Sequence, residues 1–320
     1  MKTLIVGGAG YVGSVLSESL WRQGHDVTVF DLLMFGDRSL RALVGQPRFR
    51  LVRGDIRDGR ALEEVIAGHD AVCLLAAIVG EPACNRDERT AVETNLEGAL
   101  KVLEASQRAA VDRFVFSSTC SNYGISDANL LATEESPLNP LSVYSRTKVE
   151  AEKAILAAAD ERFCPTVLRL STAFGVSPRM RFDLLVSDFT LAAHRDRKVV
   201  IYGEQFWRPF VHIRDMADAV QLVLDAPGET VRGEVFNIGS NDANVQKGEL
   251  GRMVQNEVAG AELEFIPGGT DPRSYRVDFS KAAARLGFRP QWTVRRGIQE
   301  VYELLQKNHW PDPGDKCYYN

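Results

Sequence analysis

Residues 2–31, KTLIVGGAGYVGSVLSESLWRQGHDVTVFD, decide the fold of this chain. An apolar strand, Lys2–Val6, leads into a glycine-rich turn and a helix that we expect to end near Arg22. A second apolar strand, Val27–Phe30, ends at Asp31. This order of strand, glycine turn, helix, strand and acid is typical of a dinucleotide-binding site. The sequence therefore predicts a Rossmann-type fold.

Three glycines in this turn have separate predicted roles. Gly7 lets the chain turn off the strand, Gly10 leaves room for a pyrophosphate, and Gly13 lets the helix pack closely on the sheet. Tyr11 and Val12 belong to the first turn of the helix, where free backbone N–H groups and the helix dipole favour phosphate groups. A glycine-rich turn can also bind nothing, but the flanking strands and the acid favour a cofactor.

Asp31 indicates which cofactor is bound. It follows the second strand, where a carboxylate accepts hydrogen bonds from both hydroxyls of a ribose. A carboxylate at this position would repel a 2′-phosphate by charge. We therefore predict that the cofactor is NAD rather than NADP.

The composition excludes several classes of protein. Of the 320 residues, 45% are hydrophobic and 25% are charged, and the net charge is −5. A sequence pI of about 5.7 gives no reason to expect nucleic acid or an anionic membrane as a partner. No apolar run reaches membrane-spanning length, and the first residues do not resemble a signal peptide. Five scattered cysteines and five histidines without ligand spacing predict a cytoplasmic protein with reduced thiols and no metal site.

The first half of the chain alternates between short strands and helices. Further strands are expected at Arg50–Val52, Ala71–Leu75, Arg113–Ser117 and Thr166–Leu170, and helices at Arg89–Ala109 and Ser145–Ala159. This alternation is typical of an α/β protein with a doubly wound parallel sheet, covered by helices on both faces. We predict an NAD-binding domain over residues 1–170 and a smaller, mainly substrate-binding lobe over residues 171–320.

The predicted sheet brings polar residues to one edge, because ligands bind outside the carboxyl ends of parallel strands. The residues expected there are Gly7, Asp31, Asp55, Ala76, Ser117 and Arg169. The strand that ends near Phe116 runs into a polar segment, SSTCSNYG, at residues 117–124. One hydroxyl of this segment could bind a substrate oxygen.

A tyrosine and a lysine four residues apart, Tyr144 and Lys148, follow this segment. On a helix this spacing puts both side chains on one face. The pKa of a free tyrosine is about 10, and a nearby ammonium and a charged nicotinamide would both favour the phenolate. Taken alone, the pair could also be a surface tyrosine and a solvated lysine.

Together these motifs resemble the NAD-dependent epimerase/dehydratase family, extended short-chain dehydrogenases/reductases that act on nucleotide sugars. The resemblance covers nearly the whole chain. Its motifs are GGAGYVG at 7–13, GDIRD at 54–58, LLAA at 74–77, SSTCSNYG at 117–124, YSRTK at 144–148, LRLSTAFG at 168–175 and RPFVHIRDMADAV at 208–220.

The resemblance implies a role for each motif. Thr119, Tyr144 and Lys148 would form a catalytic triad, with Tyr144 as acid/base and Lys148 as its electrostatic partner and a ligand of the nicotinamide ribose. Further cofactor contacts are expected from Asp55 and Ile56 at the adenine, and from Leu75, Ala76, Ala77, Asn95 and Ser117. Substrate contacts are expected from Thr119, Ser121, Asn122, Thr172, Arg179, Arg181, Tyr202, Arg208 and Arg273.

The four arginines among the expected substrate contacts each have a second interpretation. Arg208 and Arg273 would bind the substrate pyrophosphate as paired hydrogen-bond donors, or else form surface salt bridges. Arg179 and Arg181 either meet a sugar carboxylate or are solvated charges. The base and the sugar of the substrate are not readable from these residues.

Two departures from the family pattern narrow the reaction. Nucleotide-sugar 4,6-dehydratases carry an Asp-Glu pair directly after the triad Ser/Thr, whereas this chain has Cys120 and Ser121. Relatives that epimerise carbon 3 or 5 have a cysteine two residues before the motif tyrosine, Tyr123, and that position is also Ser121. In LRLSTAFG, Thr172 stands where many relatives have an asparagine.

We therefore predict a nucleotide-sugar 4-epimerase with tightly bound NAD. The alternatives are a 4-keto reductase or dehydrogenase with the same triad, and a non-catalytic NAD-binding sensor.

The helices Arg89–Ala109 and Ser145–Ala159 carry second apolar stripes, and in relatives these helices pair across a two-fold axis. A homodimer is expected, unless the stripes only cover the sheet. The tail, Trp310–Asn320, is expected to wrap on the surface or fit a neighbouring chain.

Overall fold

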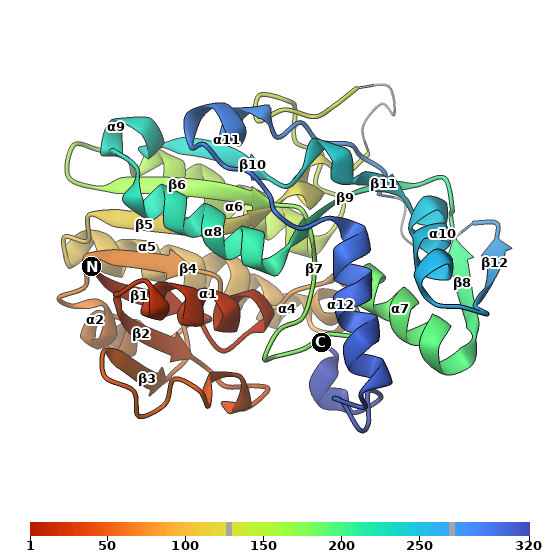
Figure 1. Ribbon diagram of the computed structural model, residues 1–320. Coiled ribbons are helices and arrows are strands. Elements are labelled where there is room, and N and C mark those ends of the chain that lie inside the picture. The colour runs from red at the N-terminus through yellow and green to blue at the C-terminus, as the bar shows by residue number, and fades with distance from the viewer. Residues whose placement is uncertain (126–129, 269–272) are drawn as a thin grey trace.

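A computed structural model describes residues 1–125, 130–268 and 273–320 of the chain and contains a seven-stranded parallel sheet (Figure 1). The strands are β1 (Lys2–Val6), β2 (Asp26–Asp31), β3 (Phe49–Arg53), β4 (Ala71–Leu74), β5 (Arg113–Thr119), β6 (Cys164–Leu170) and β10 (Glu234–Ile238). Their order in the sheet is β10-β6-β5-β4-β1-β2-β3. The α/β fold class with a parallel, Rossmann-type sheet is confirmed.

Helices cover both faces of this sheet because neighbouring strand residues point to opposite sides. On one face Ile5, Val29 and Val115 pack in a core cluster that includes side chains of α1 (Tyr11–Arg22) and α8 (Ile213–Asp225). On the other face a second cluster joins the sheet to three helices. These are α2 (Gly59–Ile66), α5 (Ala99–Arg108) and α6 (Val143–Ala157).

The predicted helix Arg89–Ala109 is not a single regular α-helix. It consists of α4 (Glu88–Val92), a π-helical turn at Glu93–Gly98 and α5, and a short α3 (Glu81–Arg86) precedes it. The wide turn brings Gly98 against the Ile56 side chain so closely that a Cβ at this position would lie 2.7 Å from it. Turns of this type often mark functional sites.

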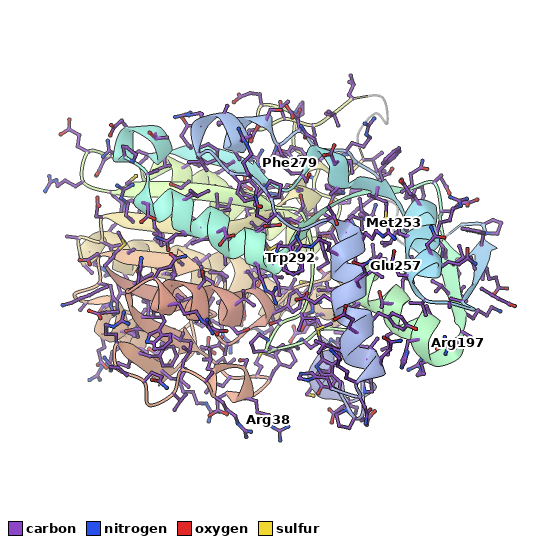
Figure 2. The ribbon with its side chains drawn as sticks, in the orientation of Figure 1. Arg38, Arg197, Met253, Glu257, Phe279 and Trp292 are labelled. Carbon is purple, nitrogen blue, oxygen red and sulfur yellow. The ribbon has the colours of Figure 1, made fainter. Side chains whose placement is uncertain are left out.

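The C-terminal lobe is built on two small sheets beside the large one (Figure 1). One contains β7 (Thr172–Phe174), β9 (Trp207–His212) and β11 (Asn244–Gln246), and the other β8 (Lys198–Tyr202) and β12 (Glu262–Ile266). Besides α8, the α-helices described in this half are α7 (Leu185–Asp196), α9 (Gly228–Val231), α10 (Lys247–Glu257), α11 (Ser280–Arg285) and α12 (Val294–Gln306). Glu257, the last residue of α10, faces α12 and accepts hydrogen bonds from Arg295 and Gln299 of that helix (Figure 2).

The boundary predicted at residue 170 does not separate the two parts cleanly. Strand β10 pairs with β6 as an edge strand of the large sheet, and α8 packs against α1. The chain therefore leaves the sheet after β6, builds part of the lobe, and returns to the sheet before it completes the lobe. None of the helices in the described ranges has the length and apolar character needed to span a bilayer.

Trp292 marks the junction of the lobe and the sheet. It lies between α8 and α12 (Figure 2), and its ring stacks on His212 at 4.2 Å. His212 is in turn hydrogen-bonded through Nε2 to Glu300 of α12, at 3.1 Å. Glu300 also accepts the backbone N–H of Val176 at 3.0 Å, so α12 holds the segment that follows β7.

Candidate active site

The glycine turn after β1 is shaped as the sequence predicts. Gly7 has a positive φ of 90°, and a Cβ there would collide with the backbone of Ala76. A Cβ on Gly13 would collide with the carbonyl oxygen of Gly7, so only glycine lets α1 approach this closely. At Gly10 a Cβ would meet nothing nearer than the Gly7 oxygen, at 3.5 Å. The turn therefore leaves open space at the N-terminus of α1.

Asp31 is fixed beside this space by two backbone groups. Its carboxylate oxygens accept hydrogen bonds from the N–H of Ala9 at 2.9 Å and from the N–H of Leu33 at 2.8 Å. Each carboxylate oxygen has a second lone pair, so Asp31 can still accept from a ribose. The predicted cofactor contact of Asp31 is compatible with this geometry.

The glycine turn is tied to the segment after β7. The hydroxyl of Tyr11 donates to the carbonyl oxygen of Gly175 at 2.5 Å, and Ser177 donates to the carbonyl oxygen of Tyr11 at 2.7 Å. The Tyr11 side chain is therefore engaged with the protein, and a phosphate contact would use the backbone of Tyr11 and Val12. These bonds place the lobe next to the predicted cofactor site.

The end of β4 forms another wall of this region. Leu75 and Ala76 donate their N–H groups to the carbonyl oxygen of Val6, at 2.8 and 2.9 Å, which brings Leu75, Ala76 and the following Ala77 beside the glycine turn. Asn95, in the π-helical turn, is hydrogen-bonded to Ile78, the residue that follows Ala77. Its Oδ1 accepts the Ile78 N–H at 2.7 Å and its Nδ2 donates to the Ile78 oxygen at 2.9 Å. Asn95 thus orders this loop, and its contact with the cofactor stays a prediction.

Asp55 and Ile56 follow β3. Asp55 forms an ion pair with Arg57 at 2.6 Å, and the hydrogen bonds from Arg57 hold the pKa of its carboxyl below the usual range. Ile56 is buried, and its side chain packs on Gly98. A contact of Ile56 with adenine would therefore run through its backbone.

Lys148 and Tyr144 lie in the first half of α6, whose N-cap is Ser142. The Lys148 side chain is only 2% exposed, and its Nζ donates to the carbonyl oxygen of Ser117 at 2.7 Å. The same Nζ lies 4.5 Å from the centre of the Phe116 ring and 6.0 Å from that of Tyr144. The fold thus joins the end of β5 to the predicted pair of α6.

The pKa values of this pair differ from the expectation for a preformed phenolate. Burial raises the pKa of Tyr144, and the nearby Cys84 thiol adds to this, whereas Arg181 and Arg273 act in the opposite direction. Burial also lowers the pKa of Lys148 to about 8. These surroundings therefore favour the neutral phenol of Tyr144. The predicted lowering of its pKa needs a further positive charge.

Thr119 and Ser121 lie at the carboxyl end of β5. Thr119 is the last residue of the strand, and its Oγ1 accepts the N–H of Ser121 at 3.1 Å. The hydroxyl of Ser121 lies 3.3 Å from the hydroxyl of Tyr275 and 3.5 Å from Nη1 of Arg273. Arg273 also pairs with Glu81 of α3 at 3.4 Å. A polar cluster therefore lies beside the predicted triad.

The structure corrects the role of Asn122. Its side chain is fully buried and donates to Glu152 at 2.8 Å and to Ser118 at 3.2 Å, away from solvent. Glu152 is a buried carboxylate of α6 paired with Arg169. Asn122 is therefore part of an internal polar network, and its side chain does not face a substrate.

The predicted pyrophosphate arginines lie side by side. Arg208 is buried, and its Nη1 donates to the carbonyl oxygens of Trp207 and Arg273. Its guanidinium lies 5.9 Å from the ring centre of Tyr275. Because Tyr275 contacts Ser121, both arginines border the same polar cluster. Arg208 is buried, whereas Arg273 is partly buried and forms its salt bridge with Glu81.

Thr172 and Tyr202 are placed differently from each other. Thr172 lies in β7 and pairs with Phe210 of β9, close to the carboxyl end of β6. Tyr202 ends β8 at the outer side of the lobe, far from α6 in Figure 1, and its side chain is 51% exposed. The structure thus does not bring Tyr202 to the triad.

Arg179 and Arg181 are not solvated charges, so that alternative is wrong. Both are buried, and Arg181 forms a two-point ion pair with Asp183, at 2.6 and 2.9 Å. The Arg179 guanidinium lies 3.8 Å from the centre of the Phe35 ring. Burial lowers the pKa of Arg179 to about 10. The charge of Arg181 opposes the raised pKa of Tyr144, as that of Arg273 does.

The C-terminal tail packs on its own chain. Asn320 accepts a hydrogen bond from Arg179 at 2.8 Å, and the Tyr318 oxygen accepts the Phe182 N–H at 3.0 Å. Trp310 is 6% exposed and lies edge-on to Phe182. The tail therefore covers the segment after β7 of its own chain.

Sequence reasoning missed three residues near the triad. Glu81 and Cys84 lie on α3, directly after the β4 loop, and Glu152 lies four residues after Lys148. Ala76 is predicted because it follows the carboxyl end of a parallel strand. The same argument extends to Glu81, five residues further along the loop. The helical spacing that selected Lys148 also places Glu152 on the same face of α6. Among the described residues, no group of three or more His, Cys, Asp and Glu could hold a metal ion.

Comparisons with known proteins agree with this geometry. The profile of the NAD dependent epimerase/dehydratase family matches residues 3–239. A UDP-glucose 4-epimerase of Lactobacillus helveticus is 31% identical over 98% of both chains. A dTDP-glucose 4,6-dehydratase of Streptomyces niveus is 31% identical over 98% of this chain and 95% of its own. The structure of the Thermus thermophilus UDP-glucose 4-epimerase in complex with NAD superposes with a TM-score of 0.84 at 25% identity, covering 96% of this chain and all of the other.

Proposed function

The chain belongs to the NAD-dependent epimerase/dehydratase family, and from this premise we propose that it is a nucleotide-sugar 4-epimerase. The family and its structural neighbours make NAD the cofactor. Modification of a nucleotide sugar by an NAD-dependent enzyme follows from the same relationship. The position of the reaction on the sugar is our proposal.

The residues present fit NAD. The space beside Gly10 has no side chain in it, and the N-terminus of α1 opens onto it. Asp31 is oriented by two backbone N–H groups and would receive the adenine ribose, while Lys148 would receive the nicotinamide ribose. When bound, NAD supplies a hydride acceptor and a positive charge beside Tyr144.

In the proposed mechanism Tyr144 moves the proton. Its phenolate takes the proton from the hydroxyl on sugar carbon 4, and its phenol later returns the proton to the same oxygen after the 4-keto sugar has turned over. Lys148 holds a positive charge close to the phenolate, which lowers the free-energy cost of forming the phenolate. Thr119 donates a hydrogen bond to the sugar oxygen and keeps it within reach of Tyr144.

Cys120 and Ser121 are the two residues that favour epimerisation over dehydration. Water loss from carbons 5 and 6 needs an acid and a base, and neither position provides a carboxylate. The Cys120 thiol donates to the Arg169 oxygen at 3.1 Å, and burial raises its pKa to about 12. Cys120 is therefore unsuited to removing a proton beside the keto group, which also disfavours epimerisation at carbon 3 or 5.

Arg208 and Arg273 would bind the diphosphate and anchor the nucleotide. A fixed diphosphate and a loosely held sugar suit an epimerase, since the sugar must present both faces to the hydride. The named relatives act on UDP-glucose and dTDP-glucose, so these nucleotide sugars are the first substrates to test.

The experiment is direct. Purified protein is analysed for bound NAD and then incubated with UDP-glucose, UDP-galactose and dTDP-glucose without added cofactor. We expect the 4-epimer to form. A 4-keto-6-deoxy product would instead establish a dehydratase. No reaction with these hydroxyl sugars, together with consumption of added NADH in a second assay with a 4-keto sugar, would establish a reductase.

A further inference from the structure

A buried polar network lies directly behind the proposed triad. Its centre is Glu152, which is 1% exposed and lies on α6, the helix that also carries Tyr144 and Lys148. The carboxylate accepts hydrogen bonds from the hydroxyl of Ser118 and from Nδ2 of Asn122, the second at 2.8 Å. It also receives the Arg169 guanidinium at 2.9 Å. A carboxylate this deeply buried needs such partners to remain charged.

The two neutral donors enclose a residue of the triad. Thr119 lies between Ser118 and Asn122 in the chain, and Asn122 also donates to Ser118 at 3.2 Å. Both sides of Thr119 are therefore anchored to one carboxylate on α6. The peptide before Ser118 is anchored to the same helix, because the Ser117 oxygen accepts the Lys148 ammonium at 2.7 Å.

Arg169 extends the network to the sheet. Its Nη1 donates to the Tyr123 hydroxyl at 3.0 Å, and Tyr123 donates to Asn237 of β10 at 2.7 Å. The carbonyl oxygen of Arg169 accepts a hydrogen bond from the Cys120 thiol at 3.1 Å. The polar segment at residues 117–123 is thus held from α6 on one side and from β6 and β10 on the other.

We propose that Glu152 is a positioning residue that fixes Thr119 relative to Tyr144 and Lys148. The triad is divided between two elements, β5 and α6, and the hydrogen bonds from Ser118 and Asn122 to Glu152 join these elements on both sides of Thr119. The proposal rests on the proposed function, since it assigns Glu152 to the reaction that the triad performs. A small displacement of Thr119 would misplace the sugar oxygen and reduce the chemical rate while leaving the binding of nucleotide unchanged.

Ser118→Ala is the mildest test of this coupling. It removes one donor to Glu152 and leaves the Arg169 ion pair in place. Ser106→Ala is the matched control, because Ser106 is also a buried serine with one internal hydrogen bond, to the Val102 oxygen of α5 at 2.7 Å. We expect Ser118→Ala to lower kcat by about tenfold or more, with KM and the Kd for NAD within about twofold of the unmutated protein. Ser106→Ala should leave all three values within about twofold.

A double mutant distinguishes positioning from a structural role. If Glu152 and Ser118 act through the triad, Ser118→Ala should lower the residual rate of Tyr144→Phe much less than it lowers the rate of the unmutated protein. Glu152→Gln should lower kcat further than Ser118→Ala, because it also removes the charge paired with Arg169. These assays use the nucleotide sugar that the unmutated protein converts among UDP-glucose, UDP-galactose and dTDP-glucose.

Two outcomes overturn the proposal, and they are distinguishable. A kcat of Ser118→Ala within about twofold of the unmutated value, together with a large loss in Tyr144→Phe, leaves the triad intact and makes Glu152 merely structural. Near-normal turnover by Tyr144→Phe removes the proposed function itself, and the positioning role with it. If Glu152→Gln does not fold, Ser118→Ala still decides between these outcomes.

Discussion

Lys148 donates a hydrogen bond of 2.7 Å from Nζ to the carbonyl oxygen of Ser117. The lysine of the proposed triad is thereby anchored to the end of β5 in the cofactor-free protein. Its burial lowers its pKa to about 8. Burial of the ammonium therefore lowers the stability of the folded protein. The surroundings of Lys148 can thus be tested by unfolding measurements, without any substrate.

Lys148→Met should stabilise the cofactor-free protein near neutral pH. The pKa of the folded-state lysine is below that of the unfolded chain, so the ammonium opposes folding at every pH below about 8. The shift corresponds to about 3 kcal/mol, from which the lost hydrogen bond to Ser117 must be subtracted. We expect a gain of about 1–2 kcal/mol at about pH 7, measured by thermal or urea unfolding.

The same gain should shrink as the pH rises. Between about pH 8 and pH 10.4 the unfolded lysine stays protonated while the folded one loses its proton, so the unmutated protein recovers stability. Lys153→Met, at an exposed position of the same helix, should change stability little at either pH. A destabilised Lys148→Met protein at neutral pH would contradict the account.

Asp31 should set the preference for NAD over NADP. Its carboxylate lies at the end of β2, where a 2′-phosphate would meet its negative charge. Asp31→Ser should narrow the difference between the two dissociation constants by about tenfold or more, as isothermal titration can measure. Asp26→Ser, at the other end of β2, is the control. Equal affinity of the unmutated protein for both cofactors would exclude the assignment.

Tyr144→Phe should abolish most of the chemistry and keep the cofactor. The ring is retained and the proton-transferring hydroxyl is lost, so turnover should fall by about 10² to 10⁴-fold. Thr119→Ala should cost less than Thr119→Val, because a water molecule can replace the hydroxyl in the first variant but not in the second. Steady-state rates and bound NAD are the measurements. Undiminished turnover in Tyr144→Phe would rule out its role.

The protein should form a homodimer through the helices around α5 and α6. Leu96, Leu100 and Leu156 are only partly buried within one chain, whereas Leu103 and Ile155 belong to its core. The partly buried leucines leave an apolar surface for a second copy. Light scattering should give twice the 35.4 kDa chain mass, and Leu100→Glu with Leu156→Glu should give the monomer.

Val44→Glu, at an exposed position before β3, is the control for this experiment and should remain dimeric. A monomer of the unmutated protein at micromolar concentration would show that the apolar stripes only cover the sheet.

The sequence predicts the sheet up to β6 but not its last strand. β10 follows β6 only after a long excursion through the lobe, so no local alternation links the two. The helix expected from Ser145 begins two residues earlier, at Val143. Its N-cap, Ser142, forms a capping box with Ser145 rather than with the more familiar Glu or Gln.

The site could be predicted where chemistry follows local pattern. Gly13 and the Tyr144–Lys148 pair depend on neighbours a few residues away. The surroundings of Arg179 depend on Phe35 and Asn320, which are distant in the chain, so the sequence alone could not show that Arg179 is buried. Asn122 was misassigned for the same reason, because its partner Glu152 is 30 residues away.

The fate of the hydrogen on sugar carbon 4 tests the proposed epimerisation most directly. A nucleotide sugar labelled with deuterium at carbon 4 is incubated with the purified protein without added NAD or NADH, and the product is examined by NMR and mass spectrometry. We predict that the 4-epimer forms from either side and keeps its deuterium at carbon 4, with no NADH released into solution. Loss of the label from carbon 4, or a reaction that requires added NADH, would contradict the account.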